Sequence, residues 1–154
     1  MRKYKVYIPV VLIILMFFAL IFFRGEMVRF ISQSRTEQLA TVVKENLSDT
    51  ITKKYDYSQN GENYEYTFLE FGSTGCYACR QMEGVMEEIK NKYVGKVKVV
   101  FVNLQKPENR ELGDYYGIAT IPTQVLLDQN GKEFFRHNGF YSVDDLVKQM
   151  NLKR

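Results

Sequence analysis

The chain of 154 residues has no tryptophan, only two cysteines and a single histidine. Small secreted domains that are held together by disulfides need several cysteine pairs, so this class is excluded. A structural zinc site needs four nitrogen or sulfur ligands, and beyond its two thiols the chain offers only His137. One copy of the chain therefore cannot complete a zinc site. We predict no metal site, although a half-site completed by a second chain stays open.

An excess of positive charge is also missing. The chain has 21 basic and 18 acidic residues, and four of the basic ones belong to the first 24 residues. The remainder holds 17 basic residues against 18 acidic ones and is close to neutral. Nucleic-acid-binding domains carry a basic surface, so no nucleic-acid partner is predicted.

One long apolar run is present, at residues 6–23, and only Pro9 interrupts it. As a helix with a rise of 1.5 Å per residue it would span about 27 Å, which suffices for a hydrocarbon core. A cleavable signal peptide would have a shorter apolar core and a small-residue cleavage site. We therefore predict that residues 1–24 form a cytoplasmic tail and a transmembrane anchor. The protein would be a single-pass protein of the cell membrane with its C-terminal domain outside the cytoplasm, although basic residues on both flanks weaken the charge asymmetry.

The next segment, residues 25–60, is predicted to be a helical stalk followed by the first helix of a globular domain. Ser34 and Glu37 have the spacing of a capping box, which predicts a helix start there. Apolar residues then recur on one stripe of that helix, and we expect it to pack on the core: Leu39, Val42, Val43, Leu47 and Ile51. The globular domain is predicted to cover residues 61–154, with a start that could lie as early as residue 36.

The remaining sequence alternates strand and helix patterns. Strands are predicted at residues 64–71, 96–103, 123–128 and 132–137, from their aromatic and β-branched content. Helices are predicted after Cys76, between Pro107 and Gly117, and after Ser142, whose spacing to Asp145 indicates an N-terminal cap. This order predicts an α/β fold in which a parallel βαβ unit is followed by an antiparallel hairpin.

Three separated motifs carry a resemblance to a known family. They are Cys76-Tyr-Ala-Cys79 at a strand-to-helix junction, "GIATIPT" with Pro122, and Asn138-Gly139 before the last helix. Together they resemble the thioredoxin family over roughly residues 64–152. The resemblance implies a thioredoxin-like three-layer fold with a mixed four- to five-stranded sheet, here preceded by one N-terminal transmembrane helix. It also implies that Pro122 is the family's cis-proline, which faces the active-site disulfide.

A fourth match and several departures concern the active site. The family places a buried acid six residues before the first cysteine, and Glu70 holds that position. Gly75 replaces the family's tryptophan before the first cysteine, and the dipeptide between the cysteines is Tyr77-Ala78. The second predicted strand has no lysine to pair with Glu70. These departures leave the redox potential and the substrate preference open.

The chemistry expected of the pair follows from its place at a helix start. Unpaired N–H groups and the helix dipole stabilise a thiolate there, so Cys76 is predicted to be the nucleophile. Cys79 lies one turn inward and is predicted to be the resolving thiol. Glu70, with a pKa raised by burial, is the candidate proton acceptor for Cys79. The redox-active disulfide Cys76-Cys79 would serve without any cofactor.

Four further residues are predicted to bind the substrate: Tyr77, Ala78, Ile121 and Gly139. The main chain of Ile121 can pair with an extended segment of a client protein. Tyr77 is the exposed member of the dipeptide, and it could either contact partners or tune the potential. His137 is expected to be a surface residue at the end of a strand.

These observations predict a membrane-tethered thiol-disulfide oxidoreductase that reduces disulfides of extracytoplasmic proteins by dithiol-disulfide exchange. Its clients would be secreted proteins, or apocytochrome c during cytochrome c maturation, and its redox partner would be a membrane electron-transfer protein. Two alternatives stay open. The protein could be a thiol oxidase or disulfide isomerase of secreted proteins, or a non-catalytic, membrane-tethered binding module.

Overall fold

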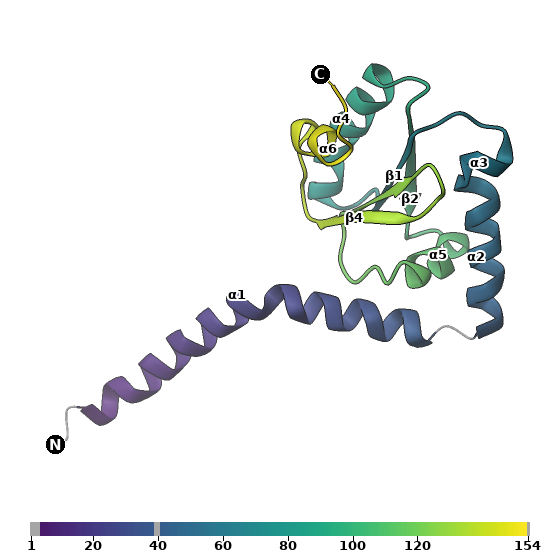
Figure 1. Ribbon diagram of the computed structural model, residues 1–154. Helices are drawn as coiled ribbons and strands as arrows, with labels where there is room; N and C mark the ends of the chain where they lie inside the picture. Colours follow the sequence, from purple (N-terminus) through teal and green to yellow (C-terminus); the bar gives the residue numbers. More distant parts are fainter. Residues whose placement is uncertain (1–3, 39–40, 154) are drawn as a thin grey trace.

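The computed structural model describes residues 4–38 and 41–153. Two helices, α1 (Tyr4–Gln38) and α2 (Thr41–Tyr55), precede a compact α/β unit to which α1 is joined as a long arm (Figure 1). The other elements follow in this order: α3 (Tyr57–Asn60), β1 (Tyr66–Gly72), α4 (Tyr77–Lys92), β2 (Val97–Asn103), the 3₁₀ turn η1 (Pro107–Asn109), α5 (Arg110–Tyr115), β3 (Thr123–Asp128), β4 (Glu133–Asn138) and α6 (Val143–Gln149).

The four strands form one mixed sheet in the order β2-β1-β3-β4. β1 pairs with β2 in parallel, whereas β1 with β3 and β3 with β4 are antiparallel. This confirms the predicted βαβ unit and hairpin. In the central register Glu70 of β1 lies opposite Phe101 of β2 on one side and Gln124 of β3 on the other.

Helices cover both faces of the sheet, which gives the three predicted layers. In Figure 1, α4 and α6 lie together on one face, and α2 and α5 lie on the other. The alternation of β1 explains this division, because Phe68 belongs to the core under α4 and α6 while Leu69 and Phe71 belong to the core under α2 and α5. Glu70 shares the face of Phe68 and therefore points toward α4.

Two of the predicted helix starts are confirmed. Ser142 caps α6, and its hydroxyl accepts a hydrogen bond from the amide of Asp145. Cys76 caps α4, and its sulfur accepts a hydrogen bond from the amide of Cys79 at 3.3 Å. The predicted helix from Pro107 is split between η1 and α5, and the chain reverses at Gly117, which has a φ of 59°.

The predicted capping box at Ser34 and Glu37 is wrong. Both residues lie inside α1, which ends only at Gln38, because the residues before Ser34 already continue the helix. The stripe assigned to the next helix is also only partly correct. Val42 is 68% exposed, Val43 and Leu47 are half-buried, and Ile51 is buried in the core. The predicted stripe residue Leu39 lies outside the described residues.

The N-terminal half of α1 leaves its apolar side chains uncovered. The side chains of residues 10–18 and 21–23 are all large and apolar, and each is about half exposed or more. Within the described residues, no single helix has the length and hydropathy of a membrane span. The segments Pro9–Phe23 and Gly25–Ser34, which are bent by 57° against each other, pass that test only as a pair.

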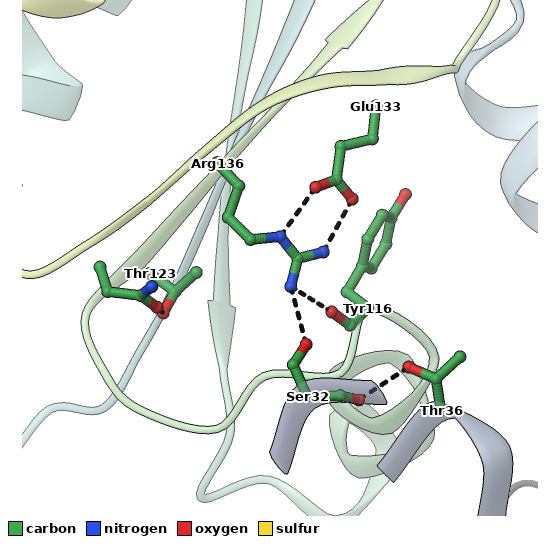
Figure 2. A network of polar contacts seen from close by, with 7 residues as sticks. Ser32, Thr36, Tyr116, Thr123, Glu133 and Arg136 are labelled. Carbon is green, nitrogen blue, oxygen red and sulfur yellow. Dashed lines mark hydrogen bonds and ion pairs between the residues drawn. The ribbon is translucent and has the colours of Figure 1, made fainter. Parts of the chain in front are cut away.

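The C-terminal half of α1 docks on the domain through a polar network (Figure 2). Arg136 of β4 forms a bidentate ion pair with Glu133 and donates to the carbonyl oxygen of Tyr116 at 2.6 Å and to the hydroxyl of Ser32 at 3.3 Å. One turn on, the Thr36 hydroxyl donates to the Ser32 carbonyl at 3.1 Å. Arg136 therefore connects α1 to the loop that leads into β3.

Gly117 permits this docking because it has no side chain. A Cβ atom there would lie 2.5 Å from the carbonyl and hydroxyl oxygens of Ser32 and 2.8 Å from the hydroxyl of Thr36. We expect Gly117→Ala to release α1 from the domain, seen as faster hydrogen exchange in residues 25–38. Gly61→Ala is the matched control, because Gly61 also has a positive φ but has no atom near its missing Cβ. Both variants should lose about 1 kcal/mol of stability from backbone strain. Equal exchange in α1 of the two variants would contradict the docking.

Candidate active site

The two cysteines lie where β1 ends and α4 begins. Both are free thiols: Cys76 is partly exposed, whereas Cys79 is 2% exposed. The residue before the helix takes an extended conformation and turns its side chain back over the first amides, so the Cys76 sulfur lies at the positive end of α4. The predicted nucleophile is thus accessible, and the predicted resolving thiol lies behind it.

The surroundings of Cys76 favour its thiolate. The pKa of this thiol is below its ordinary value, chiefly because the Cys79 thiol donates a hydrogen bond to it. The backbone amides of Cys79 and Ala78 and the Arg80 guanidinium act in the same direction, and desolvation opposes them. A thiolate is the form of cysteine that attacks a disulfide, so the geometry favours Cys76 as the attacking sulfur.

The surroundings of Cys79 favour its neutral thiol. The pKa of Cys79 is raised to about 11, chiefly by burial, and its hydrogen bond to Cys76 and the nearby Glu70 carboxylate act in the same direction, against a hydrogen bond with the Ser73 backbone. This thiol therefore needs a proton acceptor before it can attack. Gly72 makes room for the sulfur, because a Cβ at residue 72 would lie 3.2 Å from it and 2.9 Å from the ring of Phe101.

Glu70 is fully buried on the sheet face that α4 covers. The pKa of this carboxyl is raised to about 8, because burial, assisted by the charge of Cys76, outweighs the opposing hydrogen bond from Gln124. The donor is the Gln124 amide nitrogen, which lies 3.0 Å from one carboxyl oxygen and 3.4 Å from the other. An acid with this pKa can exchange a proton with a thiol near neutral pH, which is the chemistry predicted for Glu70.

The predicted cis-proline lies at the same end of the sheet. The Ile121-Pro122 bond is cis, and Pro122 leads directly into β3, whose Thr123 pairs with Phe71 of β1. Gly139, with a φ of 98°, donates its amide proton to the Pro122 carbonyl at 2.8 Å. Ile121, which is 37% exposed, therefore lies in the loop at the end of the sheet where β1 leads toward the cysteines. The roles assigned to these residues stay predictions.

The dipeptide between the cysteines faces solvent. Tyr77 is 71% exposed, and the Arg80 guanidinium lies 5.7 Å from the centre of its ring. Ala78 is half-buried. His137 lies in β4 and is half-buried, with its ring 4.3 Å from that of Tyr141. Within residues 4–38 and 41–153, no three His, Cys, Asp or Glu side chains come together as metal ligands.

The residue that sequence reasoning missed is Gln124. Its side chain is completely buried, and within the described residues its hydrogen bonds go to Glu70, the acid already identified from the sequence. A glutamine inside an otherwise apolar strand, "TQVLL", is a detectable signal for a buried polar contact. The partner could not be read from it, because the β1–β3 register brings residues 70 and 124 together.

Comparison with known proteins shows the family to which this chain belongs. The family model of the thioredoxin-like domain matches residues 53–153. The chain belongs to the thioredoxin-like family. It is 34% identical over 83 residues to a thioredoxin of Rickettsia bellii, a match that covers 54% of this chain and 76% of the relative. It is also 27% identical over 106 residues to the chloroplastic thioredoxin-like protein HCF164 of Arabidopsis thaliana, which covers 69% of this chain and 41% of that protein.

The fold agrees with solved thioredoxin structures. Thioredoxin-2, described as a component of the protein secretion machinery of a malaria parasite, matches with a TM-score of 0.52 and 28% identity. The match covers 60% of this chain and 95% of that structure. Membership of the thioredoxin-like family, together with the dithiol at the start of α4, identifies the chain as a thiol-disulfide oxidoreductase that acts on disulfide-containing substrates.

Proposed function

We propose that this thioredoxin-like protein is a membrane-tethered reductant of disulfides in extracytoplasmic proteins. In the first step the Cys76 thiolate attacks a client disulfide, forms a mixed disulfide and releases one client thiolate. In the second step Cys79 passes its proton to Glu70 and attacks the Cys76 sulfur. The Cys76-Cys79 disulfide forms, the bond to the client breaks, and the second client thiolate leaves. A membrane electron-transfer protein would then return two electrons to the pair.

The observation that supports the reducing direction is the kind of group that stabilises the Cys76 thiolate. Strongly oxidising relatives owe their potential to a highly stabilised thiolate in the reduced form. Here the groups that lower the pKa of Cys76 are a neutral thiol, two amides and one guanidinium that lies on an exposed tyrosine ring. This arrangement is consistent with a potential near the thioredoxin value of about −270 mV.

The proposed tether is the N-terminal half of α1. Its side chains of residues 10–18 and 21–23 form a continuous apolar surface that no part of the described domain covers. An apolar surface of this extent on a soluble arm would be costly, and a bilayer would bury it. The Arg136 network would then hold the catalytic domain in a fixed orientation to that anchor.

The test is a trap with Cys79→Ala in the full-length chain. Without the resolving thiol, the client stays bonded to Cys76, so we expect mixed disulfides that persist under non-reducing conditions and disappear with dithiothreitol. Membranes are isolated and washed with alkaline carbonate, and the adducts are identified by mass spectrometry. We expect them in the washed membranes, with extracytoplasmic proteins as the bonded clients.

The control is the double variant Cys76→Ser/Cys79→Ala, which has no nucleophile and should form no adduct. Absence of adducts in the single variant would contradict the enzymatic proposal. Adducts that appear only in the soluble fraction would contradict the tether alone. A measured potential nearer −120 mV would favour the oxidase alternative.

A further inference from the structure

Gln124 is the only described side chain that hydrogen-bonds the Glu70 carboxyl. The two side chains lie opposite each other in the antiparallel pair of β1 and β3, and both are 0% exposed. On the other side of Glu70, β2 brings Phe101, which can neither donate nor accept a hydrogen bond. Among the described side chains, this amide is therefore the one group that can stabilise either form of the acid by a hydrogen bond.

The amide has a second group that the described residues leave unused. The Gln124 side-chain oxygen is buried and accepts no hydrogen bond from any residue of the described chain. A buried acceptor without a partner is unfavourable, typically by about 1–3 kcal/mol. The amide nitrogen, by contrast, lies near both carboxyl oxygens, at 3.0 and 3.4 Å, as expected beside an ionised carboxylate.

These two facts fit the two states of the acid. An ionised carboxylate accepts hydrogen bonds at both oxygens, whereas a neutral carboxylic acid has one O–H donor and one acceptor oxygen. When Glu70 takes up the proton of Cys79, a rotation of the amide about its Cγ–Cδ bond brings the unused oxygen toward the new O–H. The nitrogen then donates to the remaining carboxyl oxygen, and the acid and the amide form a paired ring in which the amide oxygen accepts the hydrogen bond that it lacked.

We propose that Gln124 is a positioning residue that pairs with Glu70 in both of its protonation states and so lets the acid accept and release the proton of Cys79. The proposal rests on the proposed role of Glu70 as the proton acceptor. A lysine in this place would hold the acid ionised and unable to keep a proton, whereas an apolar residue would hold it neutral.

Other ionisable groups near the acid come from two elements. Cys76 and Cys79 face it from α4, and both are reacting groups. His137 lies directly opposite Gln124 in the antiparallel pair of β3 and β4. It is therefore on the same face of the sheet as Gln124 and Glu70, two strands away from Glu70. The pH dependence must therefore be compared with that of a His137→Gln variant, which removes the imidazole and leaves Glu70 and Gln124 in place.

The experiment uses the full chain in detergent and dithiobis(nitrobenzoate) as the probe disulfide. Cys76 attacks it and releases one coloured nitrothiobenzoate, and the attack of Cys79 on the resulting mixed disulfide releases the second. The rate of the second phase is followed against pH. We expect the pH midpoint of this phase to rise by about one unit in Gln124→Met and to fall in Gln124→Lys. Leu126→Met, a buried residue on the same strand and face, should leave the midpoint unchanged.

Glu70→Gln separates the two proposals. If it leaves the second phase unchanged, the role of Glu70 fails. If it slows that phase while the Gln124→Met and Gln124→Lys midpoints equal that of Leu126→Met, only the role of Gln124 is overturned. The Gln124 substitutions should also cause no further shift in the Glu70→Gln background.

One measurement needs no substitution. In the unmodified protein, the NMR signals of the Gln124 side-chain NH₂ should change with pH at the same midpoint as the Glu70 carboxyl. Signals that stay constant through that titration would overturn the proposal, even if a substituted chain failed to fold.

Discussion

Cys76→Ser is expected to lower the rate of dithiothreitol-driven insulin reduction by roughly 10³-fold or more, because it removes the atom that forms the mixed disulfide. Cys76 is the only sulfur that is both accessible and favoured as a thiolate, since Cys79 is 2% exposed and burial raises its pKa to about 11. Serine has nearly the same size, so the fold should be retained. The measurement is the turnover rate with matched unfolding curves for both chains.

The control separates the attacking sulfur from the resolving one. Cys79→Ala should keep the first phase of the reaction with dithiobis(nitrobenzoate) and lose the second, whereas Cys76→Ser should lose both. The alkylation rate of Cys76 against pH gives an independent check, because the Cys79 thiol is the main cause of the lowered pKa of Cys76. The pKa of Cys76 should therefore be higher in Cys79→Ala. Rapid first-phase chemistry in Cys76→Ser would contradict the assignment of the nucleophile.

The dithiol could be predicted from the sequence because its chemistry is local. The first cysteine caps a helix and the second follows one turn later, so a four-residue motif determines which thiol is exposed and which is buried. The strands were predictable for a similar reason, since their aromatic and β-branched composition is local. The end of α1 was not, because a serine and a glutamate three residues apart fit a helix interior as well as a helix start.

The acid and its partner show the limit of local reasoning. The alternation of side chains along β1 could not predict that Glu70 is buried. Helices cover both faces of this sheet, so residues on either face are buried and the apolar pattern does not single out one face. Only the family resemblance suggested it. The family resemblance did not suggest a role for Gln124. Its contact with Glu70 depends on the pairing of two strands, which brings together residues 54 positions apart. Close approaches such as Gly117 against α1 also depend on docking that no sequence motif encodes.

Glu70→Gln should give opposite results for activity and stability. The second phase of the exchange should slow by roughly 10²-fold, because a positioned general base typically contributes about that much. The free energy of unfolding should rise at the same time, because the variant no longer has to bury a group that tends to ionise. Glu88→Gln, on the exposed side of α4, is the matched control and should change neither quantity.

The pH dependence determines the sign of the stability effect. The pKa of Glu70 is about 8 in the folded protein, against an ordinary value of 4.5. Between these two values the folded state binds the proton more tightly than the unfolded chain does, so the stability of the unmodified protein falls as the pH rises from 4.5 to 8. Below 4.5 both states are protonated, and the acid contributes no difference.

The unfolding free energy of Glu70→Gln should therefore equal that of the unmodified protein below pH 4.5 and exceed it at pH 8 by roughly 2–4 kcal/mol. Urea unfolding at both ends of this pH range measures the difference. If the difference in unfolding free energy between the two chains is the same at every pH in this range, burial does not shift the pKa of the carboxyl. Glu70 then cannot serve as the acceptor for the Cys79 proton. If Glu70→Gln instead gains stability at high pH and also loses the resolving step, the buried acid serves proton transfer and lowers the stability of the folded protein.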